Sequence, residues 1–157
     1  MLGGARSLGG LTMIGVVLVT HGGLGTALLE VATWISGEDL TGVVTVSVHP
    51  EDGPDLQAAR IEQAVRRFDE GAVILTDLFG GTPQNLALSL LAEGRVDVVS
   101  GVNLPMLLAL PSARARCHDV HSLALTLLER AQGAMVAAGE TLKRHAEASR
   151  ELPAVES

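Results

Sequence analysis

Hydrophobic and polar positions along the chain form two kinds of segment: short continuous apolar runs, and longer stretches with helical spacing. The runs are rich in valine, which is typical of strands buried on both faces of a parallel sheet. They cover residues 13–20, 43–48, 72–77 and 96–100. Two proline-containing turns predict helix starts, at Asp52-Gly53-Pro54 and at Thr82-Pro83, where Thr82 is expected to be the N-cap.

Apolar residues at helical spacing predict the buried faces of the helices. The helix over 24–35 is expected to bury Leu24, Leu28, Val31, Trp34 and Ile35. The helix after Pro54 is expected to bury Ala58, Ile61, Val65 and Phe68, with Glu62 and Arg66 paired on its exposed side. A short helix is predicted over 106–110, and a long one from Asp119 to about Ala146.

Strands that alternate with helices specify an α/β fold with right-handed crossovers. We predict a three-layer sandwich in which helices flank a mainly parallel sheet of four or five strands. The domain is expected to span residues 13–146. We expect a flexible extension or tag at 1–12 and a solvated, disordered tail at 147–157.

Composition narrows the classes of function. The 157 residues, enough for one domain, hold 11 Lys and Arg against 18 Asp and Glu, a net charge of -7. This acidic balance and only 2% aromatic residues argue against nucleic acid as a partner. Cys117 is the single cysteine, which excludes an internal disulfide or cysteine-based zinc site. The apolar run at 11–19 is interpreted as strand, because no cleavage site follows it, and this predicts a cytoplasmic protein.

Polar side chains follow the predicted strands at their carboxyl ends, where sites of α/β sheets lie. They are His21, His49, Asp77 and Asn103. His21 precedes Gly22 and Gly23 at a helix start, whose N–H groups and dipole favour an anion. Asp77 can accept a hydrogen bond from the His21 ring and fix its tautomer. A second helix start, with its glycines and a hydroxyl, follows Asp77 on the same edge: Gly80, Gly81 and Thr82.

Two segments without lysine or arginine further narrow the predicted class of function. No Lys or Arg lies within 13–48 or 71–94, and no nucleotide-binding loop is present. Kinases need cations or metal against the transferred charge, so the pattern favours a phosphoryl carrier without a cofactor. A metal triad of His21, His49 and Asp77, as in a chelatase-like protein, stays open as an alternative in which His49 is otherwise a loop or rim residue. The remaining histidines are expected at the surface: His118, His121 and His145.

Three stretches, taken together, resemble the mannose-type (mannose/fructose/sorbose) enzyme IIA family of the bacterial phosphoenolpyruvate-dependent sugar phosphotransferase system (PTS). They are Met-Ile-Gly-Val-Val-Leu-Val-Thr-His-Gly at 13–22, Leu-Thr-Asp-Leu-Phe-Gly-Gly-Thr-Pro at 75–83 and Gly-Val-Asn-Leu-Pro-Met at 101–106. The resemblance covers residues 13–135 and implies that His21 is phosphorylated by the carrier HPr and passes the group to a IIB component. The membrane permease would be reached only indirectly.

The resemblance also implies roles for the surrounding residues. Asp77 would orient His21, Thr82 would supply a small hydroxyl, and the glycines would line the phosphate site: Gly22, Gly23, Gly80 and Gly81. Family members are typically homodimers, some with an exchanged C-terminal strand. Gln84 stands where many members carry an aromatic residue, a departure expected to alter the rim that meets partners.

Two further alternatives stay open. A phosphotransfer subunit of the dihydroxyacetone kinase system would share the chemistry and differ in the recipient. A regulatory protein would use its phosphorylation state to control another enzyme. The sequence does not identify a sugar, because the IIB and membrane components contact it in this system.

Overall fold

The computed structural model describes residues 13–150, with side chains over 13–148, so the expectations for 1–12 and 151–157 lie outside the described residues. The strands are β1 (Gly15–His21), β2 (Val43–Val48), β3 (Ala72–Thr76) and β4 (Val96–Ser100). The helices are α1 (Leu24–Ser36), α2 (Pro54–Val65), α3 (Thr82–Leu88), α4 (Leu104–Arg114), α5 (Val120–Gly133) and α6 (Ala138–Arg150).

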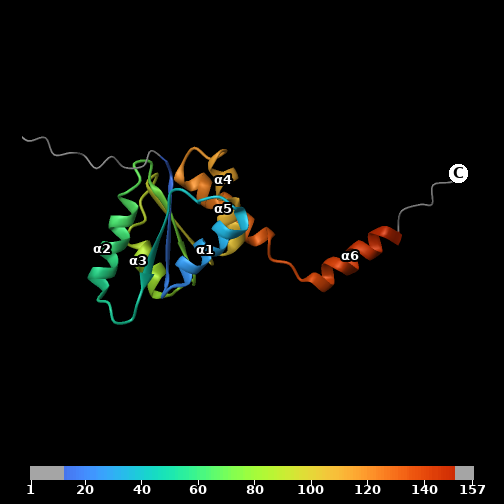
Figure 1. Ribbon diagram of the computed structural model, residues 1–157, viewed down its shortest axis with the longest axis horizontal. Helices are drawn as coiled ribbons and strands as arrows, with labels where there is room; N and C mark the ends of the chain where they lie inside the picture. Colours follow the sequence, from blue (N-terminus) through green and yellow to red (C-terminus); the bar gives the residue numbers. More distant parts are fainter. Residues whose placement is uncertain (1–12, 151–157) are drawn as a thin grey trace, which may run out of the picture.

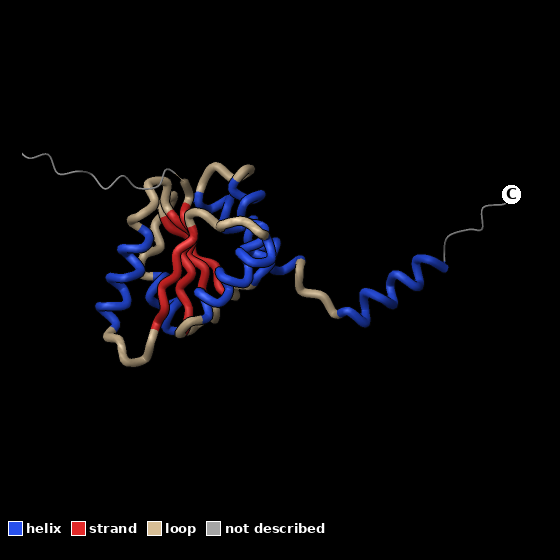
Figure 2. The backbone as a smooth tube through the Cα atoms, viewed as in Figure 1, coloured by secondary structure: helices blue, strands red, loops and turns tan. Residues whose placement is uncertain are grey.

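The four strands form one parallel sheet in the order β2-β1-β3-β4 (Figure 2). This confirms the predicted α/β class and the four-stranded form of the sheet. β1 is central because it pairs with both β2 and β3, and its Val16, Val17, Leu18 and Val19 are 0% exposed. The valine-rich run therefore lies buried on both faces, as such runs do in parallel sheets.

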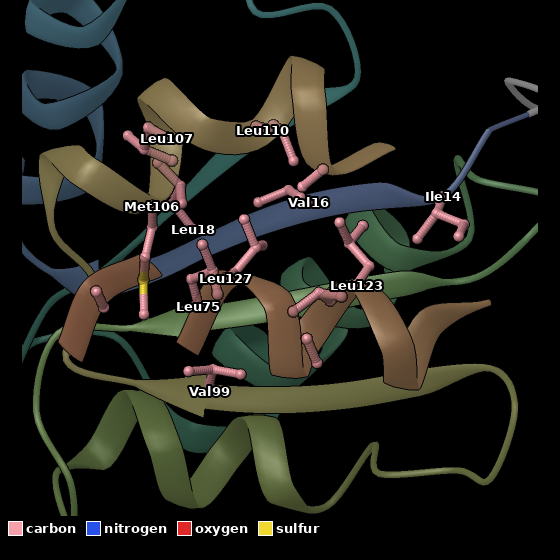
Figure 3. Close-up of a cluster of buried hydrophobic side chains, with 14 of the residues drawn as sticks. Ile14, Val16, Leu18, Leu75, Val99, Met106, Leu107, Leu110, Leu123 and Leu127 are labelled. Atoms are coloured by element: carbon pink, nitrogen blue, oxygen red, sulfur yellow. The ribbon is translucent and has the colours of Figure 1, made fainter. Parts of the chain in front are cut away.

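Helices cover both faces of the sheet and make three layers. One core cluster joins the sheet to α1, α4 and α5, and the other joins it to α2 and α3 (Figure 1). In the first cluster, side chains from α4 and α5 pack on Val16 and Leu18 of β1, Leu75 of β3 and Val99 of β4 (Figure 3). Within the sheet, β1 and β3 are neighbours and end side by side.

The predicted buried face of α1 is wrong by one position. Buried or half-buried residues of this helix are Gly25, Leu28, Leu29, Ala32 and Thr33, so the prediction is confirmed only for Leu28. Several predicted core residues are exposed instead: Leu24 by 45%, Val31 by 38%, Trp34 by 81% and Ile35 by 50%. The reason is close packing, since a Cβ added at Gly25 would lie 3.2 Å from Leu18 Cβ and 3.0 Å from Thr20 Oγ1. Small residues let α1 approach β1, and the large ones are left outside.

The predicted long C-terminal helix is two helices. α5 ends at Gly133, and α6 begins at Ala138 and lies apart from the layered body (Figure 1). The buried stripe of Val120, Leu123, Leu127 and Ala131 stops before Met135, which is 68% exposed. Glycine at 133 disfavours continuation of a helix that has lost its packing surface. The expected tail is also shorter, because 147–150 belong to α6.

Other boundaries differ locally. α4 spans eleven residues, longer than the short helix predicted over 106–110. The N-cap of α3 is Gly81, so Thr82 is the first helical residue and not the predicted cap. Ile61 and Val65 of α2, and Phe68 beyond its end, are buried as predicted, whereas Ala58 is half-buried. Arg66 pairs with Glu62 at 2.6 Å. None of the helices within 13–150 combines the length and apolar character needed to span a membrane.

Candidate functional site

His21 and Asp77 meet at the carboxyl ends of the two central strands. His21 is the last residue of β1, and Asp77 follows the last residue of β3. The His21 backbone N–H donates to Asp77 Oδ2 at 2.9 Å, and ring atom Nδ1 lies 3.0 Å from Oδ2 and 3.2 Å from Oδ1. One carboxylate therefore holds both the main chain and the ring of His21. A neutral ring that donates from Nδ1 carries its lone pair on Nε2.

Asp77 is the more covered member of this pair. Its side chain is 11% exposed, whereas that of His21 is 50% exposed. Burial alone raises the pKa of Asp77, but the hydrogen bonds from the His21 N–H and ring, and the attraction of that ring, outweigh it and hold the pKa below its ordinary value. Asp77 is thus kept as a carboxylate beside a ring that remains open to solvent.

The turn after His21 leaves backbone N–H groups available next to this residue. Gly22 has a φ of 51°, a conformation that glycine adopts without strain, and its N–H donates to the Val48 carbonyl at 2.9 Å. The buried Thr20 hydroxyl accepts the Gly25 N–H at 2.8 Å. Within the described residues, no hydrogen bond occupies the N–H groups of Gly23 and Leu24. This helix start retains two free donors near His21.

Gly81 lies against the outer edge of the His21 ring. A Cβ added at Gly81 would lie 3.0 Å from His21 Cε1 and 3.6 Å from Nε2. Its φ of -79° is open to any residue, so the requirement at this position is space and not backbone conformation. The absence of a side chain at Gly81 keeps access to Nε2 open.

Gln84 has a role that the sequence analysis missed. It was expected at the rim, but it is 5% exposed, and its Oε1 accepts a hydrogen bond from the Gly80 N–H. Gly80 therefore already uses the donor that was predicted to bind phosphate. A Gln four residues after Gly80, in the first turn of a helix, was the available signal, because such side chains fold back to cap backbone N–H groups.

Within the described residues, the other predicted edge residues make no hydrogen bond or ion pair with His21 or Asp77. Asn103 caps α4 by accepting the Met106 N–H at 3.2 Å. The His49 carbonyl accepts from Gln57 at 2.6 Å, and its ring lies 4.0 Å from Glu51. Among residues 13–150, no three His, Cys, Asp or Glu side chains converge as metal ligands. The alternative metal triad with His49 therefore does not assemble.

A second His–Asp pair was not anticipated. His121 Nδ1, at the start of α5, lies 2.8 Å from Oδ2 of Asp97 in β4. A cavity of about 500 Å³ is lined by Asp77 of the first pair and by both members of the second pair, Asp97 and His121. No motif marks this pair in the sequence, because its two residues lie in unrelated segments.

Comparison with known proteins agrees with this arrangement. Residues 15–128 match the family EIIA-man, described as PTS system fructose IIA component. The chain is 37% identical over 105 residues to the PTS system fructose-specific EIIA component of Bacillus subtilis (strain 168), covering 65% of this chain and 71% of that protein.

Two further comparisons extend the picture. The chain is 29% identical over 104 residues to the PTS system mannose-specific EIIAB component of Escherichia coli (strain K12), covering 64% of this chain and 32% of that longer protein. The crystal structure of phosphotransferase system component EIIA from Streptococcus agalactiae matches with a TM-score of 0.73 and 25% identity, over 82% of this chain and 99% of that chain. The chain therefore belongs to the EIIA-man family of phosphotransferase-system IIA components.

Proposed function

We propose that the protein is a phosphohistidine carrier that accepts a phosphoryl group from phospho-HPr on His21 and passes it to a IIB component. The observation that carries this proposal is the contact of His21 Nδ1 with Asp77 at 3.0 Å, which leaves Nε2 free. Family membership supports a role in phosphotransfer within a sugar PTS. The donor, the recipient and a homodimeric state are part of the proposal.

The transfer follows from the ring's protonation. Neutral His21 attacks the phosphorus atom with the Nε2 lone pair, so that the Nε2–P bond forms while the donor's P–N bond breaks. The proton on Nδ1 stays there, and the Asp77 carboxylate stabilises the positive charge that develops on the ring. The reverse sequence, with a IIB histidine as nucleophile, returns His21 to its neutral form.

The surroundings supply donors but no cation. The free N–H groups of Gly23 and Leu24 can receive phosphoryl oxygens, with help from the dipole of α1. Residues 13–48 and 71–94 contain no Lys or Arg. A phosphoryl group held by dipoles alone is less stabilised than one held by cations, which suits a group that must be passed on.

A reconstituted transfer tests the proposal. The protein is incubated with labelled phosphoenolpyruvate, enzyme I and HPr, and then with a IIB component. We expect acid-labile label on the chain that moves to IIB, and no label on His21→Gln. Labelling of His21→Gln at the wild-type level would overturn the proposal, as would labelled wild-type protein that returns its group to HPr but never to a cognate IIB.

A further inference from the structure

The outer edge of β2 is open to pairing. β2 is an end strand of the sheet and pairs with β1 on one side only. Its sequence, Val-Val-Thr-Val-Ser-Val, contains neither a charged residue nor proline. Edge strands commonly carry such residues to prevent the addition of a further strand. β2 therefore lacks the residues that would prevent a further strand from pairing with it.

The register identifies the backbone groups on the open side. The carbonyls of Gly42 and Val48 accept N–H groups of Val16 and Gly22 near and within β1. Backbone groups of a strand alternate between its two sides, so the odd-numbered positions between 42 and 48 face away from β1. Thr45 and Ser47 therefore present their N–H and C=O groups to the open edge.

A cavity of about 610 Å³ follows this edge between β2 and the side of α2. Four consecutive strand residues, 44–47, line it together with His49. The opposite wall comes from α2 and the turn after it: Arg60, Gln63, Ala64 and Arg67. A groove lined by four consecutive residues of an edge strand can accommodate an extended peptide.

The charge of this groove contrasts with that of the chain. The protein has a net charge of -7, and residues 13–59 contain no Lys or Arg. Arg60 of α2 and Arg67 of the turn after this helix both line the groove. Arg60 pairs with Asp52 at 2.6 Å, whereas Arg67 makes no ion pair with any other described residue. Arg67 is therefore available to a carboxylate from outside.

We propose that this groove binds an extended acidic segment of another protein as an added strand beside β2. The main chain of the segment pairs with Thr45 and Ser47, and alternate side chains face α2, where carboxylates meet Arg67. A second copy of the chain fits poorly, because two-fold pairing of β2 with β2 would bring the groove arginines of both copies together. This surface is separate from the phosphocarrier role of His21.

The test uses a fluorescein-labelled ten-residue peptide of alternating valine and glutamate, followed by fluorescence anisotropy. We expect saturable binding that weakens at least tenfold in Arg67→Glu. Arg130→Glu is the matched control, since Arg130 lies in the last turn of α5 and the substitution changes net charge equally. We expect no binding of the peptide with lysine in place of glutamate, and at least tenfold weaker binding when alternate peptide N–H groups are methylated.

Four outcomes would overturn the proposal: equal losses in both variants, binding unaffected by N-methylation, equal binding of the lysine peptide, or self-association of the chain through this edge. Inorganic phosphate is added at matched ionic strength, and selective displacement of the peptide by it would instead identify a small-anion site. Labelling of His21 is expected to be unchanged in Arg67→Glu. The failure of this proposal and that of the phosphocarrier proposal are therefore distinguishable.

Discussion

In both His–Asp pairs of this protein, the histidine Nδ1 contacts a carboxylate oxygen of the aspartate, but the surroundings of the two pairs differ. Nδ1 of His21 lies 3.0 Å from Asp77, and Nδ1 of His121 lies 2.8 Å from Asp97. The first pair joins the ends of two central strands, and its side chains are 50% and 11% exposed. The second joins an edge strand to α5 and is 71% and 26% exposed.

The two pairs differ in how the histidine is held and in what lies against its ring. Asp77 also binds the His21 main chain, Gly81 lies against the ring edge, and free N–H groups follow at the start of α1. The His121 ring contacts Asp97 at the surface, and a different carboxylate, that of Asp119, interacts with the His121 main chain. The hydrogen bond to the histidine main chain and the glycine against the ring edge therefore distinguish the first pair. Asp77 lines the same cavity as Asp97 and His121, so the second pair serves as a nearby control for the first.

The largest expected effect separates the two histidines. His21→Gln is expected to remove all phosphoryl transfer, and His121→Gln to remove none, because only Nε2 of His21 lies in the site described above. Rates of labelling by phospho-HPr measure both. Loss of labelling in His121→Gln with intact folding would show that the two pairs act together.

The next effect concerns the carboxylates. Asp77→Asn is expected to slow transfer roughly 10- to 100-fold, since the amide neither fixes the ring tautomer nor stabilises its positive charge. Asp97→Asn is the matched control and is expected to leave the rate unchanged. Single-turnover kinetics provides the measurement, and equal rates for the wild type and Asp77→Asn would remove Asp77 from the mechanism.

A smaller effect is expected at Gly81. Gly81→Ala places a methyl group 3.0 Å from Cε1 of His21 and is expected to lower the transfer rate roughly tenfold by displacing the ring. Gly53→Ala is the control, because Gly53 is also an extended N-cap and a Cβ there meets nothing within 4 Å. If both variants transfer at the wild-type rate, the contact with Gly81 does not limit access to Nε2.

The smallest effect is on stability against pH. The pKa of Asp77 is lower in the folded protein than in the unfolded chain, where it is about 3.9. The ionised carboxylate therefore stabilises the fold above the unfolded pKa, and this stabilisation is lost as the pH falls through the folded pKa. The free energy of unfolding of the wild type is expected to exceed that of Asp77→Asn by about 1 kcal/mol near pH 6. This difference is expected to shrink towards pH 2. Urea denaturation measures it, and a difference that is constant with pH would contradict the linkage.

The sequence predicted the central strands and the meeting of His21 with Asp77, because buried parallel strands have a strong apolar signature and their carboxyl ends share an edge. It did not predict the buried face of α1. Leu24 and Trp34 follow the same helical period as the true core residues, and only the close approach at Gly25 decides which stripe faces the sheet. Periodicity fixes the spacing of a face but not its rotation.

Side-chain capping was the other feature beyond prediction. Gln84 is buried because its side chain accepts the Gly80 N–H, a contact that depends on the local course of the turn. The pairing of His121 with Asp97 depends on the packing of α5 beside β4, which residue patterns do not specify. In both cases tertiary geometry gives a polar residue its partner.

The proposed transfer mechanism is best tested by identifying the nitrogen atom that carries the phosphoryl group. Protein labelled with ¹⁵N in histidine is phosphorylated through HPr, and the phosphorus–nitrogen coupling is observed by NMR. The proposed mechanism predicts a single phosphohistidine, at Nε2 of His21, with Nδ1 still protonated beside Asp77. Phosphate on Nδ1 of His21, or on His121, would contradict it.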